Sequence, residues 1–72
     1  MNKAVPIGLA STLTGVSVAT IRAWERRYGV PSPNRAANGR RIYSRKSLND
    51  IRLMSRLVSS GLPASLAAKR IE

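Results

Sequence analysis

Arginine is the residue type with the most to offer chemically in this sequence, and it recurs in two clusters. The first consists of Arg22, Arg26 and Arg27, and the second of Arg40, Arg41, Arg45 and the neighbouring Lys46. The guanidinium group is a planar fork of donors that fits phosphate oxygens and guanine edges. Thirteen basic residues, ten of them arginine, face only three acids and give a net charge of +10. This excess predicts a polyanionic partner, with nucleic acid ahead of an anionic membrane surface.

The same composition argues against catalysis and metal binding. The chain has no cysteine and no histidine, which excludes disulfides and the usual zinc ligand sets. Its three acids, Glu25, Asp50 and Glu72, are scattered, so no carboxylate pair or nucleophile–base pair is visible. We therefore expect a protein that is not an enzyme, with no cofactor and no metal.

The first arginine cluster lies in a segment, residues 17–28, whose spacing predicts an amphipathic helix. Ile21, Trp24 and Tyr28 fall at i, i+3 and i+7 and so form one apolar stripe. The opposite side carries Ala19, Arg22, Ala23 and Arg26, with Thr20 beside them. Small side chains let a helix backbone come close to a DNA groove while the arginines reach bases or phosphates. This arrangement favours groove contact over an ordinary solvated basic face.

Three further side chains each allow two interpretations. Trp24 could stack on a base, but its spacing favours burial in the core. Glu25 is expected to pair with an arginine and fix the orientation of its helix or of a neighbouring hairpin, although it could instead accept a hydrogen bond from a cytosine amino group. Tyr43 could bind a phosphate or cover the core, and both interpretations stay open.

Short elements are predicted to position these residues. Residues 7–13 read as a helix that begins after Pro6. Gly15 suits the positive φ of a helix C-terminal turn, Val16 can fill the angle between two helices, and Ser17 is a good N-cap for the next one. Two short helices joined by a tight glycine turn predict a helix-turn-helix.

The segment after these helices has loop composition and predicts a hairpin. Residues 29–40 contain two prolines, two glycines and two asparagines. The pair Asn38-Gly39 is a strong hairpin-turn signal, with residues 41–43 as the strand after it and residues 33–36 as the strand before it. A hairpin placed after the second helix, here residues 38–43 in particular, would be a wing.

The C-terminal part predicts two more helices. One runs over residues 45–60 from the cap Ser44 to Gly61, and another starts near residues 62–63. The expected core consists of Leu9, Leu13, Val16, Ile21, Trp24, Tyr28, Leu48, Ile51, Met54, Leu57, Leu62, Leu66 and Ile71. The predicted fold is mainly α, a winged helix-turn-helix of about four helices and a short β-hairpin wing. Residues 1–72 would form one domain.

The combined pattern resembles the MerR family of bacterial transcription regulators. The residues that carry the resemblance are the runs Thr14-Gly15-Val16-Ser17, Thr20-Ile21-Arg22-Ala23-Trp24-Glu25 and Gly39-Arg40-Arg41-Ile42-Tyr43-Ser44. The run from Arg22 to Gly29, with Pro31-Ser32-Pro33 and Arg35 after it, looks like the branch that includes the regulators CarA, CarH, LitR and MlrA. Arg40 and Ala23 each stand at a position where the family usually has tyrosine.

The resemblance implies DNA contacts at particular positions. The second helix, residues 17–28, would enter the major groove while the wing contacts the backbone. By position, Thr20, Arg22 and Arg26 would contact DNA from the helix, and Arg41 and Tyr43 would contact phosphate from the wing. The full set of candidate DNA-binding residues is Ser17, Ala19, Thr20, Arg22, Ala23, Arg26, Arg35, Arg40, Arg41 and Tyr43.

The resemblance also implies a partner and a setting. We expect sequence-specific binding of double-stranded DNA at a palindromic operator, a homodimer formed through a region outside this chain, no effector or dimerisation domain within it, and a cytoplasmic, nucleoid-associated location without a membrane. The alternative is an excisionase-type protein that bends DNA in site-specific recombination. A basic module for RNA or membrane surfaces is a third possibility.

Overall fold

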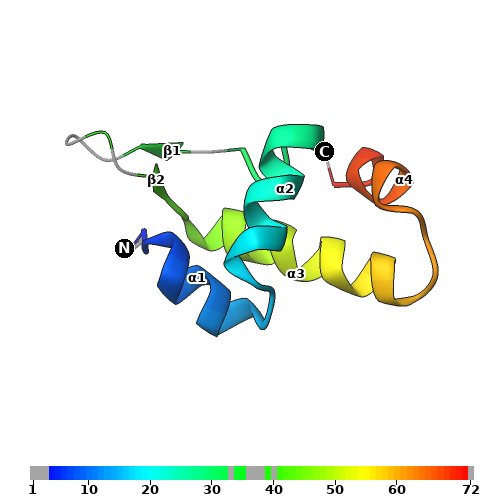
Figure 1. The fold of residues 1–72 in the computed structure, drawn as a ribbon, viewed down its shortest axis with the longest axis horizontal. Helices are drawn as coiled ribbons and strands as arrows, with labels where there is room; N and C mark the ends of the chain where they lie inside the picture. Colours follow the sequence, from blue (N-terminus) through cyan, green and yellow to red (C-terminus); the bar gives the residue numbers. More distant parts are fainter. Residues whose placement is uncertain (1–3, 33, 36–38, 40, 72) are drawn as a thin grey trace.

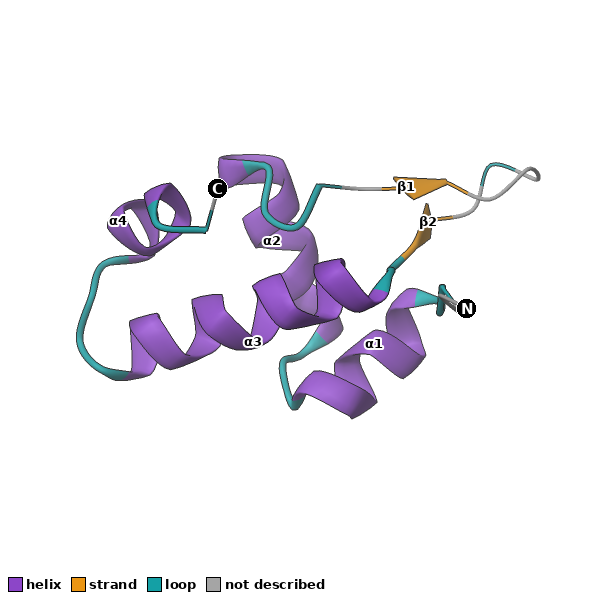
Figure 2. Cartoon of the chain, turned by 180° about the vertical axis from the view of Figure 1, so that it is seen from behind, coloured by secondary structure: helices purple, strands orange, loops and turns teal. Residues whose placement is uncertain are grey.

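The computed structural model describes residues 4–32, 34, 35, 39 and 41–71, with only the backbone of residues 34 and 35. The elements in chain order are α1 (Ile7–Thr14), α2 (Val18–Tyr28), β1 (Asn34–Arg35), β2 (Arg41–Ile42), α3 (Arg45–Ser59) and α4 (Ala64–Lys69). Helix α1 packs against α2 and α3, and α4 folds back against α3 (Figure 1). The two strands project from the opposite end of the molecule to α4 (Figure 2). This mainly helical architecture confirms the predicted fold class.

The connection between α1 and α2 has the geometry that the sequence predicts. Gly15 ends α1 with φ 76°, a left-handed conformation that costs glycine little. Val16 is buried between the helices. The Ser17 hydroxyl accepts a hydrogen bond from the Thr20 backbone N–H at 3.1 Å, so Ser17 caps α2 as expected.

Helix α3 is the longest element and supplies one side of the core. The Ser44 hydroxyl caps it by accepting from the Ser47 backbone N–H at 3.2 Å. Leu48, Ile51 and Met54 form the buried stripe predicted from their spacing. In the described part of the chain, no helix is both long and apolar enough to cross a membrane.

The prediction that three leucines belong to the core is wrong, because the structure shows them exposed. Leu9, Leu13 and Leu66 are 44%, 46% and 47% exposed. Alanines take the inward positions instead, because Ala10 of α1 and Ala67 of α4 are fully buried. A methyl side chain at the contact lets two helices approach closely, so the larger neighbours face outward. On α1 and α4, the larger apolar residue was predicted to be buried, but the smaller alanine occupies the inward position.

The wing forms where the sequence predicts it, with the second strand beginning at Arg41. Strands β1 and β2 are antiparallel, with Asn34 opposite Ile42 and Arg35 opposite Arg41. This register leaves residues 36–40 to connect the strands, which is longer than a two-residue hairpin turn. Gly39 has φ 85°, and Asn38 lies outside the described residues.

The base of the wing is joined to the N-terminal segment. Tyr43 and Val5 exchange backbone hydrogen bonds of 2.7 and 2.9 Å in an isolated antiparallel bridge. The chain before α1 thus pairs with the end of the second wing strand. The sequence analysis did not predict this contact: Val5, a β-branched residue before Pro6, favours extended backbone, but no local pattern names Tyr43 as its partner.

Candidate nucleic-acid interface

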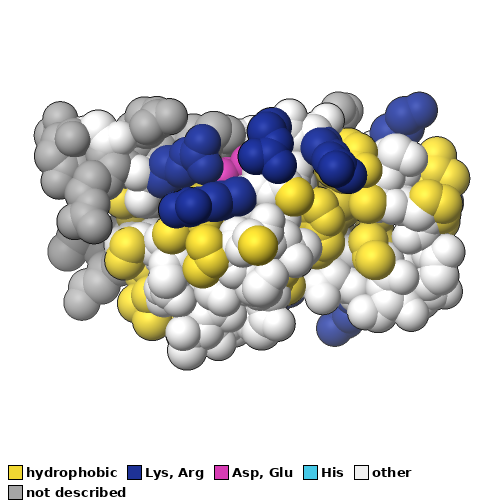
Figure 3. All heavy atoms as spheres, in the orientation of Figure 1, with side chains coloured by type: hydrophobic (Ala, Val, Ile, Leu, Met, Phe, Trp, Pro, Cys, Tyr) yellow, Lys and Arg dark blue, Asp and Glu magenta, His cyan; other side chains and the backbone are white. Residues whose placement is uncertain are grey.

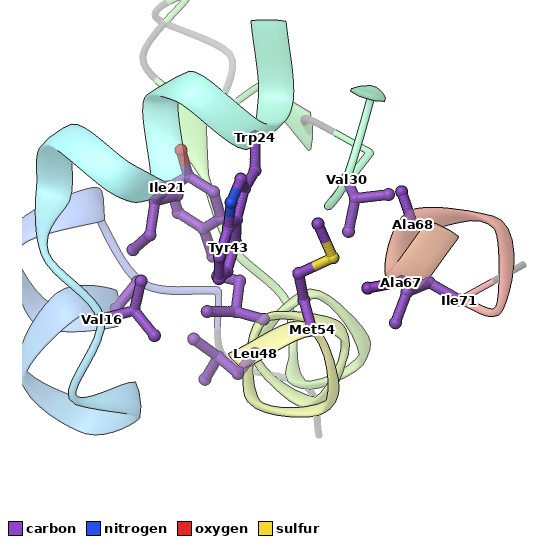
Figure 4. Packing of buried hydrophobic residues seen from close by; sticks show 12 residues of the cluster. Val16, Ile21, Trp24, Val30, Tyr43, Leu48, Met54, Ala67, Ala68 and Ile71 are labelled. Atoms are coloured by element: carbon purple, nitrogen blue, oxygen red, sulfur yellow. The ribbon is translucent and has the colours of Figure 1, made fainter. Parts of the chain in front are cut away.

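Helix α2 divides into an apolar side and a basic side. Ile21 and Trp24 are buried, and Figure 4 shows their side chains directed from α2 towards Leu48 and Met54 of α3. Arg22 and Arg26, on the other side of the helix, are exposed. The predicted amphipathic pattern is therefore confirmed, and Trp24 is a core residue rather than a free surface for base stacking. Packing against α3 fixes which side of α2 faces solvent.

The exposed side of α2 and the wing together line a cleft. Its volume is about 490 Å³, and its lining residues are Arg22, Glu25, Arg26 and Arg41. Figure 3 shows lysine and arginine side chains gathered along this face, with acidic surface visible between them. Three cations around one cleft create a local positive potential that favours an anionic group.

An ion pair joins the wing to α2 across this cleft. Arg41 Nη1 of β2 lies 2.9 Å from Glu25 Oε1 of α2. The Glu25 side chain is only 4% exposed, whereas the Arg41 side chain is 41% exposed. The expectation that Glu25 pairs with an arginine is confirmed. The pair joins residues that are sixteen positions apart in the chain.

Tyr43 is a buried residue, which corrects its assignment as a wing contact to phosphate. Its side chain is fully buried, so it covers the core. The Tyr43 hydroxyl and Glu25 Oε2 are both buried and have no hydrogen-bond partner among the described residues. Burial raises the pKa of Tyr43 to about 12, and the neighbouring Glu25 carboxylate adds to the rise while Arg41 opposes it. Tyr43 therefore supports the wing from beneath.

The remaining candidate contacts fall into three groups. Ser17 and Ala19 are exposed at the start of α2, whereas Thr20 in its first turn and Ala23 at its middle are half-buried. The Ser17 hydroxyl also donates to Thr20 Oγ1 at 2.8 Å, so both hydroxyls already have a partner within the cap. Arg40 and the side chain of Arg35 lie outside the described residues.

Arg52 has a specific contact that the sequence analysis missed. Its position on α3 predicts a solvated side chain, and it is exposed, but its Nη2 donates to the Leu13 backbone carbonyl at 3.2 Å. The last carbonyls of a helix lack partners within the helix, and they favour a cation. Arg52 therefore links α3 to the C-terminal end of α1. Its partner is 39 residues away, so no local pattern reveals the contact.

Comparison with known proteins shows the family to which the chain belongs. The family of MerR HTH regulatory proteins matches residues 5–72. The chain belongs to the MerR family. This MerR-family domain is 44% identical over 63 residues to the HTH-type transcriptional repressor CarH of Myxococcus xanthus, covering 88% of the chain. It is 44% identical to CarA of the same organism over 62 residues, or 83% of the chain. It is 34% identical to the HTH-type transcriptional regulator MlrA of Escherichia coli K12 over 59 residues, or 82% of the chain. The family and the branch expected from the sequence are both confirmed.

The chain spans only part of the length of these relatives. The matched region is only 21%, 22% and 24% of the length of CarH, CarA and MlrA. The fold also matches the crystal structure of a MerR-family transcriptional regulator from Bacillus thuringiensis, with a TM-score of 0.82, 20% identity, and coverage of 96% of this chain and 60% of that one. At this identity the likeness shows that the winged-helix fold is shared.

Proposed function

We propose that this MerR-family domain binds double-stranded DNA sequence-specifically and serves in transcriptional regulation. The observation that carries the proposal is the exposed side of α2, where Arg22 and Arg26 stand opposite a buried apolar stripe and next to Arg41 of the wing. CarH and CarA are named transcriptional repressors and MlrA a transcriptional regulator, which supports the same function here.

In the proposed complex, α2 lies in the major groove and the wing lies on the phosphate backbone. Ala19 is small and exposed at the start of α2, so the backbone there can approach base edges. Arg22 and Arg26 reach guanine edges or phosphates with their forked donors. Arg41 contacts a phosphate through the exposed part of its side chain, and such contacts set position rather than sequence preference.

The proposal extends to the oligomeric state, the operator and the location of the protein in the cell. We propose a palindromic operator bound by two copies that associate through chain outside residues 1–72, in a protein that is not an enzyme. The short share of CarH, CarA and MlrA that is matched supports the presence of such additional chain in relatives. Access to chromosomal DNA would place the protein in the cytoplasm with the nucleoid.

Selection of bound fragments from random duplex DNA tests the proposal. From residues 1–72 alone we expect one enriched half-site motif, bound about 10³-fold or more tighter than unrelated duplexes at physiological salt. A protein that also carries the dimerising chain should select two inverted copies of this motif. Equal, salt-sensitive binding to all duplexes, or a preference for RNA or anionic vesicles, would overturn it. Enrichment of tandem direct repeats would instead favour an excisionase role.

A further inference from the structure

The cleft between α2 and the wing contains a charge that opposes DNA binding. Glu25 is a carboxylate at the floor of a site lined by Arg22, Arg26 and Arg41. By Coulomb's law alone, an anion placed there lowers the attraction of the cleft for a phosphate. Removal from water also disfavours a carboxylate, and this one is 4% exposed. A negative charge in this place therefore needs a structural reason.

The reason lies in how Glu25 contacts Arg41. Only Nη1 of Arg41 is paired with the carboxylate, and the Arg41 side chain remains 41% exposed towards solvent. A guanidinium has five N–H donors in a rigid fork, so one edge can be paired with a carboxylate while another edge stays available. The other side of the Glu25 carboxylate is buried near Tyr43, which restricts its movement.

We propose that Glu25 is a positioning residue, which orients Arg41 so that the exposed edge of its guanidinium meets one DNA phosphate in the cleft between α2 and the wing. The proposal rests on the proposed function, because it assigns a role within the same DNA-binding site. A long, flexible arginine on a two-residue strand loses side-chain entropy when it binds a phosphate. The ion pair with Glu25 fixes much of that freedom before DNA arrives, so less is lost in the complex.

The substitution Glu25→Gln tests this proposal, because the two explanations of the carboxylate predict opposite changes in DNA affinity. If Glu25 acts only as a nearby anion, its neutralisation tightens DNA binding. If it positions Arg41, the same substitution weakens binding by about five- to tenfold. The negative slope of log K against log salt then becomes less steep by roughly 0.9, as if one phosphate contact were lost. The DNA used is the duplex selected by the wild-type protein.

A double-mutant cycle and a matched control make the interpretation specific. In an Arg41→Ala background, Glu25→Gln should no longer weaken binding, because there is no guanidinium left to orient. Asp50→Asn removes an acid paired at the same 2.9 Å with Lys46, but within α3, and should change affinity by less than about twofold. Tighter or unchanged binding by Glu25→Gln, or equal weakening in both backgrounds, would overturn the proposal.

Arg41→Lys keeps the test decisive if Glu25→Gln does not fold. Lysine preserves the charge at a half-exposed site but is a point charge without the fork. We expect Arg41→Lys to bind the selected duplex nearly as weakly as Arg41→Ala, and wild-type affinity for Arg41→Lys would refute the positioning role. If the wild-type protein itself selects no duplex, the proposed function fails together with this inference. Failure of the variants alone removes only the inference.

Discussion

The two sides of α2 are attached to the rest of the molecule in different ways. On the inner side, Ile21 and Trp24 pack against α3 through extensive apolar burial. On the outer side, the described part of the wing is joined to α2 by the ion pair of Glu25 with Arg41. Burial of apolar surface dominates stability, whereas an ion pair with a buried carboxylate adds little net stability, because removing that carboxylate from water offsets the attraction. The fold therefore depends on the inner side, and the outer side can be specialised for DNA at small cost to stability.

The largest expected effect is the loss of stability when a buried residue on the inner side of α2 is truncated. Ile21→Ala deletes a fully buried side chain and should lower the free energy of unfolding by about 2–5 kcal/mol, measured by urea denaturation. Leu53→Ala, at an exposed position of α3, is the control and should cost less than about 1 kcal/mol. Equal losses at the two positions would mean that the burial pattern described here does not determine stability.

Tyr43 lies where the two sides meet, and its ionisation should reveal that position. The folded pKa is about 12 and the ordinary value is 10.0, so the unfolded chain loses the proton first as pH rises. The resulting stability, about 2–3 kcal/mol, is fully present below pH 10 and is lost as pH rises from about 10 through 12. Urea denaturation across this range should therefore show a falling free energy of unfolding.

The Tyr43→Phe variant isolates this contribution to the pH dependence. It should flatten the decline between pH 10 and 12, because phenylalanine has no ionisable hydroxyl. Tyr28→Phe, at a half-buried position of α2, is the matched control and should leave the decline in place. An equally steep decline in Tyr43→Phe would contradict the assignment to Tyr43.

Substitutions on the outer side should change DNA binding. Arg22→Ala should leave stability unchanged, whereas Arg41→Ala also leaves the buried Glu25 carboxylate without its partner and should lower the free energy of unfolding. Arg22→Ala should weaken the selected site by about 1–3 kcal/mol and relax its sequence preference. Arg41→Ala should weaken all duplexes alike and flatten the salt dependence by roughly one phosphate contact. Binding isotherms on selected and scrambled duplexes at several salt concentrations measure both. Unchanged affinity of Arg22→Ala for the selected site would show that the other face of α2, or another element, reads the DNA.

The sequence predicted the elements whose signals are local. The cap of α2 by Ser17, the glycine turn at Gly15 and the stripe of α3 each depend on neighbours within one or two helical turns, and all three are confirmed. The partnership of Glu25 with an arginine was also predictable, because one acid among many arginines has few other options.

The features that the sequence did not predict are set by tertiary contacts. Leu9 and Ala10 are adjacent apolar residues of α1, and only the close approach of its neighbours decides that the alanine faces inward. The bridge between Val5 and Tyr43 and the contact of Arg52 with the Leu13 carbonyl join segments 38 and 39 positions apart. Tyr43 allowed two interpretations because its burial depends on tertiary packing with residues of other elements, such as Ile21 of α2 and Leu48 of α3.

The smallest expected effect separates the two possible uses of Ser17, which caps α2 at the edge of the proposed DNA-binding side. Ser17→Ala removes the cap and should cost about 1 kcal/mol of stability. Ser17→Asp keeps a capping oxygen and should preserve stability, but it adds an anion near the groove and should weaken DNA binding several-fold at low salt. Ser44→Asp makes the same change at the cap of α3 and serves as the control. Equal loss of binding in both aspartate variants would assign the effect to overall charge, whereas a loss confined to Ser17→Asp places the start of α2 at the DNA.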